Sequence, residues 1–215
     1  MVYIPNYFRI QDKDEIEGIM QANSFGILVT VQDQLPLATH LPFFYDAEYH
    51  ALFAHMARAN SQWQNLDGQT VLVIFSGPHA YISPSWYQVP HMVPTWNYTA
   101  VHVYGVATRV DDRNDLMSLM NNLVRVYEPD SPLLQQTSES FYQNMLQDIV
   151  GFRINITDIQ ATAKLSQNKP LEARWRVVEK LRERGTEDAQ GVAEGMIKEI
   201  NRATRNQGKG GKLVE

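Results

Sequence analysis

Residues 25–54 read FGILVTVQDQLPLATHLPFFYDAEYHALFA, and this stretch decides the fold. Three runs rich in β-branched and aromatic residues, at 25–31, 35–44 and 49–54, are separated by short polar segments typical of turns. Runs of this length and spacing predict an antiparallel meander. The centre of the protein is therefore expected to be an antiparallel sheet.

The flanking sequence extends this sheet and adds helices. Asp12 and Glu15 have the spacing of a capping box, which predicts a helix that starts there. A second helix is expected after Asp112, where leucines and a methionine recur at helical spacing. The remaining expected elements are strands at 70–75, 79–83, 96–110 and 151–157, a turn at Gly77-Pro78, a bend at Gly105, a short helix at 60–66 and a proline-rich loop or lid at 84–95.

The C-terminal part predicts two amphipathic helices, at 171–184 and 188–205, with Gly185 between them. Their apolar stripes are Leu171, Trp175, Val178 and Leu181 on the first, and Val192, Met196, Ile197 and Ile200 on the second. The Gly- and Lys-rich end after about residue 205 is expected to fray. These elements predict an α+β fold with six or seven antiparallel strands around a closed or half-closed barrel.

Composition indicates a soluble, cytoplasmic, well-cored protein of one domain with an appendage. Hydrophobic residues make up 44% of the 215 residues and charged residues 20%. The longest apolar runs are far shorter than the roughly 18 residues of a membrane span, and the first residues lack the layout of a signal peptide. The absence of cysteine excludes disulfides, thiolate metal sites and a cysteine nucleophile.

Charge divides the chain unevenly near residue 163. Residues 1–163 hold 7 Lys and Arg against 16 Asp and Glu, whereas residues 164–215 hold 12 against 8. One interpretation is that the terminal helices expose ordinary solvated basic faces. The other is a basic appendage that meets DNA or the phosphate of a ligand.

Three segments carry candidate chemistry. Arg58 precedes a helix start at Asn60 or Ser61, an arrangement that suits a phosphate monoester. A surface arginine beside an ordinary capped helix would give the same sequence pattern. Residues 76–105 hold six of the 22 aromatic residues, enough to wall a flat ring system or to fill a barrel core. Residues 164–169 place amide side chains between two lysines, which suits phosphate and ring carbonyl groups or a simple turn before Pro170.

Other chemistries find no support in the spacing of residues. The six histidines form no zinc-binding pattern. The chain contains neither a dinucleotide-binding Gly-x-Gly-x-x-Gly nor a Walker loop, and it lacks the Gly-x-Ser-x-Gly elbow of hydrolases. The sequence therefore predicts no metal site and no hydrolase.

Six blocks, in order along the chain, resemble the PaiB family, whose members are described as FMN-binding negative transcriptional regulators. They are YIPNYF at 3–8, THLP at 39–42, HMARAN at 55–60, GPHAYISPSWY at 77–87, VPTWNY at 93–98 and KLSQNK at 164–169. The resemblance covers nearly the whole chain. It implies a split β-barrel related to pyridoxamine-phosphate oxidase and flavin reductases, and a homodimer with FMN at the subunit interface.

The resemblance also implies a set of cofactor-binding residues. Arg58, Asn60 and Ser61 would form the phosphate cradle, His55 and Met56 would line the adjacent strand end, and Thr39 and His40 would contact the flavin edge. Tyr81, Ser83, Trp86 and Trp96 would wall the ring, and Lys164, Gln167, Asn168 and Lys169 would close the site from the partner chain. Residues 1–163 would then form the FMN-binding split barrel, and residues 164–215 a basic helical segment that closes the site.

Three functions remain open at this point. The first is an FMN-binding regulator whose basic helices meet DNA or a regulatory partner. The second is an FMN-dependent oxidoreductase, of the flavin reductase or pyridoxamine-phosphate oxidase kind, in which the cofactor carries the chemistry and the protein orients it. The third borrows from haem-handling relatives of the same barrel, with one of the histidines as axial ligand.

Overall fold

The computed structural model describes residues 3–135 and 144–210, with side chains up to residue 205. The chain forms two compact units. The barrel unit comprises Lys13–Phe75 and Val101–Gln160; the helical unit comprises Met1–Asp12, Ser76–Ala100 and Ala161–Glu215. Three long strands contribute residues to both units: β6 (Thr70–Ile82), β7 (Thr95–Val110) and β8 (Ile149–Lys164). The predicted boundary between residues 163 and 164 stays a prediction.

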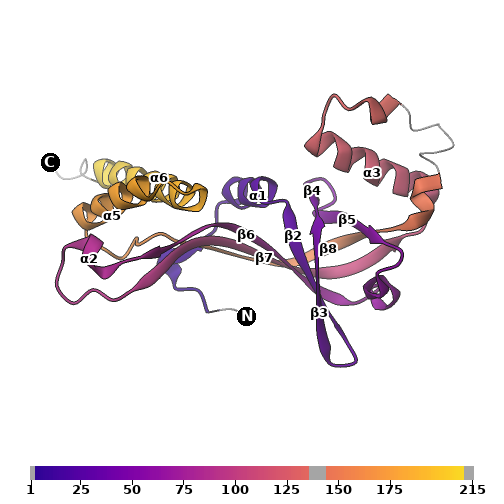
Figure 1. The fold of residues 1–215 in the computed structure, drawn as a ribbon, viewed down its shortest axis with the longest axis horizontal. Coiled ribbons are helices and arrows are strands. Elements are labelled where there is room, and N and C mark those ends of the chain that lie inside the picture. The colour runs from indigo at the N-terminus through magenta and orange to yellow at the C-terminus, as the bar shows by residue number, and fades with distance from the viewer. Residues whose placement is uncertain (1–2, 136–143, 211–215) are drawn as a thin grey trace. The chain divides into compact units, whose positions relative to one another are not determined.

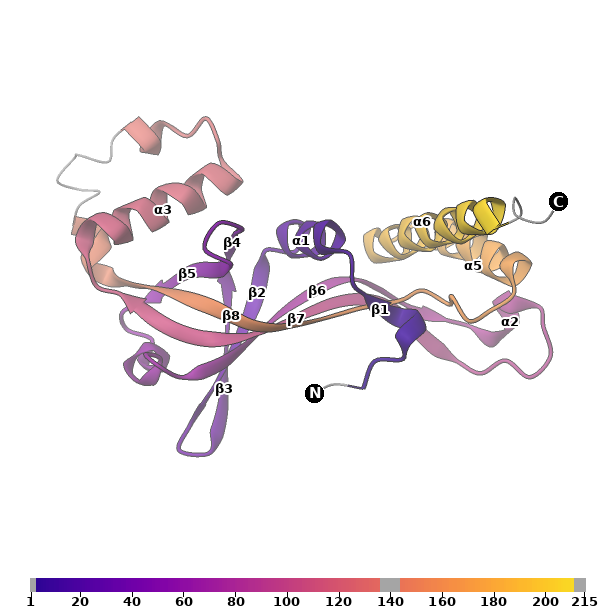
Figure 2. The ribbon, with the colours of Figure 1, turned by 180° about the vertical axis from the view of Figure 1, so that it is seen from behind.

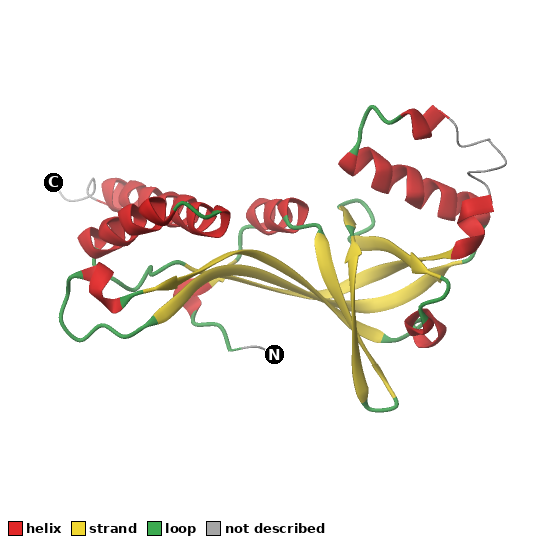
Figure 3. Ribbon diagram, viewed as in Figure 1, coloured by secondary structure: helices red, strands yellow, loops and turns green. Residues whose placement is uncertain are grey.

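The barrel unit is built on the antiparallel meander that the sequence predicts. Strand β2 (Phe25–Gln32) pairs with β3 (Leu35–Pro42) through a two-residue turn, Asp33-Gln34, in which both residues have positive φ (51° and 65°). β4 (Phe44–Asp46) pairs with β5 (Ala51–Ala57), and β5 pairs with β8. The sheet order is β3-β2-β6-β7-β8-β5-β4. Figure 3 shows the strands in yellow. Because β3 also contacts β5, the sheet in this unit curls back on itself.

The α+β, antiparallel fold class is confirmed, with eight strands in the described residues rather than six or seven. One additional strand is the two-residue β1 (Arg9–Ile10), which pairs with β8. The other arises because the predicted strand at 35–44 is divided: β3 ends at Pro42 and β4 begins at Phe44. Phe43 between them is 1% exposed, and its N–H donates to the carbonyl of Ser24 (2.8 Å) rather than to a neighbouring strand.

Strand β6 corrects the expected turn at Gly77-Pro78, because the chain continues as one strand from Thr70 to Ile82. At these two residues the chain packs closely against other elements and does not reverse its direction. A Cβ on Gly77 would overlap Oγ1 of Thr99, and a Cβ on Gly191 would lie 2.6 Å from Cγ of Pro78. β8 is likewise longer than the expected 151–157, and the expected loop at 84–95 contains a short helix, α2 (Pro84–Tyr87).

The helical unit contains α5 (Leu171–Arg184) and α6 (Glu187–Gly210), which pack side by side in Figures 1 and 2. Gly185 ends α5 with a φ of 71°, and its N–H donates to the carbonyl of Leu181. The predicted stripe on α5 is partly wrong. Leu171 and Trp175 are 47% and 39% exposed, and the buried face is formed by Ala173, Val177, Val178 and Leu181.

The expected fraying after about residue 205 stays a prediction. Helix α6 continues to Gly210, so residues 206–210 are helical. Residues 211–215, to which the same prediction applies, lie outside the described residues.

The barrel unit carries two further helices, α1 (Lys13–Ala22) and α3 (Arg113–Tyr127). Asp112 caps α3 by accepting from the N–H groups of Asn114 (2.8 Å) and Asp115 (3.0 Å). α1 contacts β4, and α3 contacts β4 and β5 (Figure 1). No helix in the described part of the chain is long and apolar enough to cross a membrane.

Candidate functional site

In the barrel unit, a polar cluster forms where β3 meets the end of β5. Asn60 caps the 3-10 helix η2 (Ser61–Asn65) by accepting from the N–H of Gln62 (3.0 Å), and its Nδ2 donates to Oγ1 of Thr39 (3.1 Å). Thr39 in turn donates to Oε1 of Gln62 (2.5 Å). Gln62 is 4% exposed, and its Nε2 donates to Oγ1 of Thr30 (2.9 Å). Two predicted site residues, Thr39 and Asn60, are thus in direct contact.

Arg58 stands two residues before this cap and is held in place by its surroundings. Its Nε donates to the carbonyl of Gln147 (2.6 Å) and its Nη2 to that of Ile149 (2.8 Å). The guanidinium also lies over the ring of Trp63, 5.9 Å from its centroid. These contacts do not involve Nη1, and the side chain is exposed. A fixed, exposed guanidinium is preorganised to bind an anion.

The other predicted residues of the barrel unit differ in exposure. His40 is exposed on β3, and Ser61 is exposed at the start of η2. His55 is half-buried on β5, and its Nδ1 is buried with no hydrogen-bond partner in the described residues. Met56 is 2% exposed, so its side chain belongs to the core. Successive strand residues point to opposite faces, and Met56 can therefore contact a ligand on the His55 side only through its backbone.

In the helical unit, Lys164, Asn168 and Lys169 line one cavity of about 180 Å³. Its other lining residues are Phe8, Tyr87, Val93, Thr95, Asn97 and Ser166. Nζ of Lys164 donates to Oγ1 of Thr95 (2.7 Å), and Nζ of Lys169 lies 5.9 Å from the centroid of the Tyr87 ring. The two lysines thus bring positive charge to a pocket with an aromatic wall.

The predicted Gln167 has a different position from its neighbours. Its Oε1 accepts from the N–H of Leu165 (2.7 Å), and its Nε2 donates to the carbonyl of Ala163 (2.6 Å). The amide is therefore folded onto its own turn, where Ser166 has a φ of 63°. Gln167 stabilises the turn that presents Lys164, Asn168 and Lys169 to the cavity.

The four remaining predicted residues lie near the ends of β6 and β7. Tyr81 is 39% and Trp96 53% exposed, and their rings meet edge to face with centroids 6.1 Å apart. Trp86 packs under the guanidinium of Arg184 at 4.6 Å, and Oγ of Ser83 bonds to Oγ of Ser85 (2.8 Å). Tyr81 and Trp96 therefore do not fill a core, and their exposed rings are available for stacking.

Comparison with known proteins identifies the family. The sequence model of the family described as "Putative FMN-binding domain" matches residues 2–158, well over half of the chain. The chain belongs to this family. The protein named "Protease synthase and sporulation protein PAI 2" from Bacillus subtilis strain 168 is 40% identical over 201 residues, which cover 91% of this chain and 96% of that protein. The resemblance to the PaiB family is thereby confirmed.

Solved structures share the fold of this FMN-binding family member at low identity. The flavocytochrome Anf3 from Azotobacter vinelandii has a TM-score of 0.61 and 15% identity, covering 75% of this chain and 72% of that chain. The FAD and haem binding protein from Mycobacterium smegmatis also has a TM-score of 0.61, with 11% identity and 73% of each chain covered. These likenesses support the split-barrel architecture.

FMN is the cofactor of this family, and the side chains present in this FMN-binding chain fit it. FMN carries an anionic phosphate monoester and a flat, three-ring flavin. Arg58 with Asn60, and Lys164 with Lys169, offer cationic and amide donors for the anion. Tyr81, Trp96 and the wall of the cavity at Tyr87 offer aromatic area for the ring. Among the described residues, no three His, Asp or Glu side chains gather as metal ligands.

Several residues that support these groups were not predicted. Gln62 and Thr30 anchor the Thr39–Asn60 contact, but a buried amide has no sequence signature of its own. Asn97 and Ser166 are 0% and 3% exposed, and each lies inside a block that carried the family resemblance. The family blocks are therefore the signal in the sequence that marks these two residues.

Tyr87→Phe is expected to lower the free energy of unfolding by about 1 kcal/mol. The Tyr87 hydroxyl, in a side chain with 0% exposure, bonds to Oγ of Ser166 (2.8 Å), which Nδ2 of Asn97 also reaches (3.0 Å). Urea denaturation would measure the loss. Tyr81→Phe, at an exposed hydroxyl, is the control and should change little; equal effects of the two variants would contradict the assignment.

Stability is expected to fall as the pH drops below about 6.5, partly through His55. Burial lowers the pKa of His55 from its ordinary value of 6.5, so the folded protein prefers the neutral ring while the unfolded chain binds the proton. This contribution is present above pH 6.5 and is lost as the pH falls below it. His55→Gln should therefore show a smaller difference between urea midpoints at pH 7.5 and 5.5. An unchanged difference would mean that other groups, such as His102, dominate.

Proposed function

We propose that the protein is an FMN-binding homodimer that holds the cofactor at the subunit interface and acts as a negative transcriptional regulator of the PaiB type. The observation that carries the cofactor site is Arg58, whose guanidinium is fixed by the carbonyls of Gln147 and Ile149 beside the Thr39–Asn60 contact. Family membership supplies the identity of the cofactor.

In this proposal the phosphate binds at Arg58, Asn60 and Ser61. The fixed guanidinium would bind a phosphate oxygen with a charge-assisted hydrogen bond, at little cost in side-chain entropy because two of its nitrogens are already bonded. The hydroxyl and backbone N–H of Ser61 add neutral donors next to it. Thr39 and His40 on β3 would contact the flavin edge.

The flavin ring would be contacted by the predicted site residues of the helical unit. Tyr81 and Trp96 expose aromatic faces that suit stacking, and Lys164, Asn168 and Lys169 add donors for ring carbonyl oxygens. Supplied by the partner chain, this group would make each site depend on both protomers. Dimerisation and FMN binding would then stabilise one another.

When bound, FMN supplies one- and two-electron redox chemistry. The chain's own contribution would be to orient the cofactor and to hold protons near it. His55 has its pKa lowered by burial, so at neutral pH it is an uncharged imidazole that can donate or accept one hydrogen bond. Such a group can hold a proton close to a ring nitrogen without adding a positive charge.

The proposal is tested first by the visible spectrum and mass of the purified protein. About one FMN per chain, identified by chromatography after release, and a particle of twice 24.6 kDa in sedimentation equilibrium are expected. A colourless monomer that binds no added FMN would refute both parts. A monomer that binds FMN would refute only the interface.

The proposed role in transcriptional regulation is supported by similarity to PAI 2, whose name refers to protease synthesis and sporulation. Direct DNA reading by α5 is disfavoured by the contacts of its basic residues. Arg176 donates to the carbonyl of Tyr87 and Arg184 to that of Tyr81, and each chain has a net charge of −5. Regulation through a protein partner or a bound ligand is therefore the form we propose.

A reporter strain lacking the gene tests this regulatory part. Reporter expression from the regulated promoters should rise in this strain. It should return to the wild-type level when the gene for this protein is restored. Purified protein should bind promoter DNA without sequence preference in a salt titration. Unchanged reporters would refute the regulatory role, and sequence-specific binding that survives high salt would refute the indirect form.

An FMN-dependent oxidoreductase is the second candidate, favoured by the neutral, half-buried His55 in the predicted cofactor group. It would reduce or oxidise a small molecule with a nicotinamide or oxygen as the second substrate. Loss of the visible absorbance of the bound flavin on addition of NADPH, without free flavin, would favour this function. No change with NADH or NADPH would count against it.

A further inference from the structure

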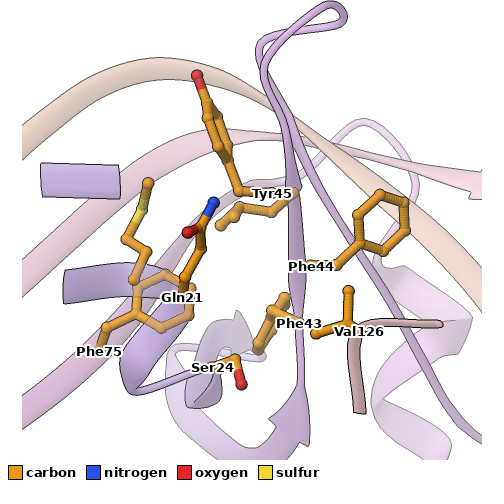
Figure 4. Close-up of a pocket in the computed structure, with 9 residues that line it drawn as sticks. Gln21, Ser24, Phe43, Phe44, Tyr45, Phe75 and Val126 are labelled. Carbon is orange, nitrogen blue, oxygen red and sulfur yellow. The ribbon is translucent and has the colours of Figure 1, made fainter. Parts of the chain in front are cut away.

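The barrel unit contains a second cavity that uses none of the residues predicted to bind FMN. It has a volume of about 290 Å³ and is shown in Figure 4. Its walls are apolar and largely aromatic: Phe43, Phe44 and Phe75, with Met20 and Leu52. Phe43 and Phe75 meet edge to face, with centroids 5.7 Å apart. Helix α1, strands β4, β5 and β6 and helix α3 each contribute to it.

One edge of this cavity is polar. Ser24 lines the cavity there, and its Oγ lies 2.8 Å from the hydroxyl of Tyr127, which is not a lining residue. This one hydrogen bond leaves further donor or acceptor capacity on the Ser24 oxygen. Gln21 is another polar lining residue; its side-chain amide forms no hydrogen bond with the described residues and offers both an N–H and a carbonyl. Figure 4 shows Gln21 and Ser24 among the aromatic side chains. This edge can therefore bind a ligand's hydroxyl or carbonyl group.

The charge around the cavity disfavours anions. The lining residues include no Asp, Glu, Lys, Arg or His. Near the rim, burial and the negative charges of Glu17 and Asp46 raise the pKa of Tyr45. A cavity without a cationic lining residue offers no compensation for the hydration that a carboxylate or a phosphate loses on entry, whereas a neutral polar group loses less.

We propose that this cavity, formed by α1, β4–β6 and α3, binds a neutral aromatic molecule of one or two rings that carries a hydroxyl or carbonyl group. The volume is about twice the roughly 150 Å³ that is enough for benzene in an apolar cavity, which suits two fused rings. Aromatic walls favour a flat ligand through edge and face contacts. The polar edge selects the substituent. This inference does not depend on FMN binding.

Calorimetric titration of the full chain with 1-naphthol tests whether this cavity binds a neutral aromatic ligand. Binding with a dissociation constant on the order of 100 µM is expected for a ligand of this size. The anion 1-naphthoate should bind at least about 10-fold more weakly because no cationic residue lines the cavity to compensate its desolvation. 1-Naphthol affinity should be the same with and without FMN. No binding at about 1 mM 1-naphthol, or equal binding of 1-naphthoate, would overturn the proposal.

Two variants locate the ligand. Val126 lies at the rim and is 51% exposed, so Val126→Trp should block the cavity and abolish binding; Val31→Trp, 53% exposed on β2 and outside the cavity, is the matched control. Ser24→Ala should weaken 1-naphthol about 5-fold, the effect of one neutral hydrogen bond, and should leave weak binding of naphthalene unchanged. Thermal unfolding shows that each variant is folded. Undiminished binding in folded Val126→Trp would place the ligand elsewhere and overturn the proposal.

Discussion

Arg58→Ala is expected to weaken FMN binding about 30-fold, which corresponds to roughly 2 kcal/mol for one lost charge-assisted hydrogen bond. The same substitution removes the bonds from Nε to Gln147 and from Nη2 to Ile149. Because the side chain is exposed, the associated loss of stability should be modest, about 1 kcal/mol. Fluorescence titration of FMN, together with urea denaturation of the apoprotein, measures the two effects separately.

Arg58→Lys and Arg153→Ala are the controls for this result. The lysine keeps the positive charge but cannot reproduce the planar fork that spans two carbonyls, so its affinity should lie between that of the wild type and that of Arg58→Ala. Arg153 is exposed on β8 and belongs to no predicted cofactor group, so its removal should leave FMN affinity unchanged. Full affinity in folded Arg58→Ala would mean that the phosphate binds elsewhere.

Gly105→Val is expected to have the largest effect on stability. A Cβ at this position would overlap the carbonyl oxygen of Asn155 and lie 2.5 Å from Cγ2 of Ile154. The first of these atoms is backbone in β8 and cannot rotate away, so β7 and β8 would have to separate locally. We expect a loss of about 3 kcal/mol or more in the free energy of unfolding and a fall in Tm of roughly 10 °C.

Gly18→Ala is the matched control for the glycine substitution. Gly18 lies within α1, and an added Cβ would meet no atom within 4 Å. Because alanine favours a helix over glycine, this variant should be more stable by about 0.5–1 kcal/mol. Opposite signs for the two variants are expected; a stable Gly105→Val would contradict the close approach of β7 and β8.

Elements governed by neighbouring residues could be predicted from the sequence. The turn at Asp33-Gln34, the Asp112 cap and the Gly185 helix end all depend on chemistry within a few positions. The continuity of β6 could not be predicted, because the usual meaning of Gly77-Pro78 is a turn. In this fold Gly77 and Pro78 pack against Thr99 and Gly191, and no local sequence pattern connects those distant residues to them.

In the candidate site, too, residue types could be predicted and long-range contacts could not. The residue types at Arg58 and Asn60 were predictable as anion donors, and the family blocks pointed to both. The carbonyls that hold Arg58 were not predictable, because they lie 89 and 91 residues further along the chain and come close only when β5 pairs with β8. Long-range pairing of this kind has no signal in a single sequence.

The three strands shared by both units have a consequence for any attempt to dissect the protein by shortening its gene. Each unit is assembled from separate stretches of chain, so no single cut yields one unit intact. A chain ending at residue 160 would lose α5, α6 and the last part of β8, and with them Ser166 and Met196, the hydrogen-bond partners of the fully buried Asn97. The exposed apolar surface would favour aggregation over an independently folded fragment. Point substitutions are therefore the suitable way to assign roles to the two units.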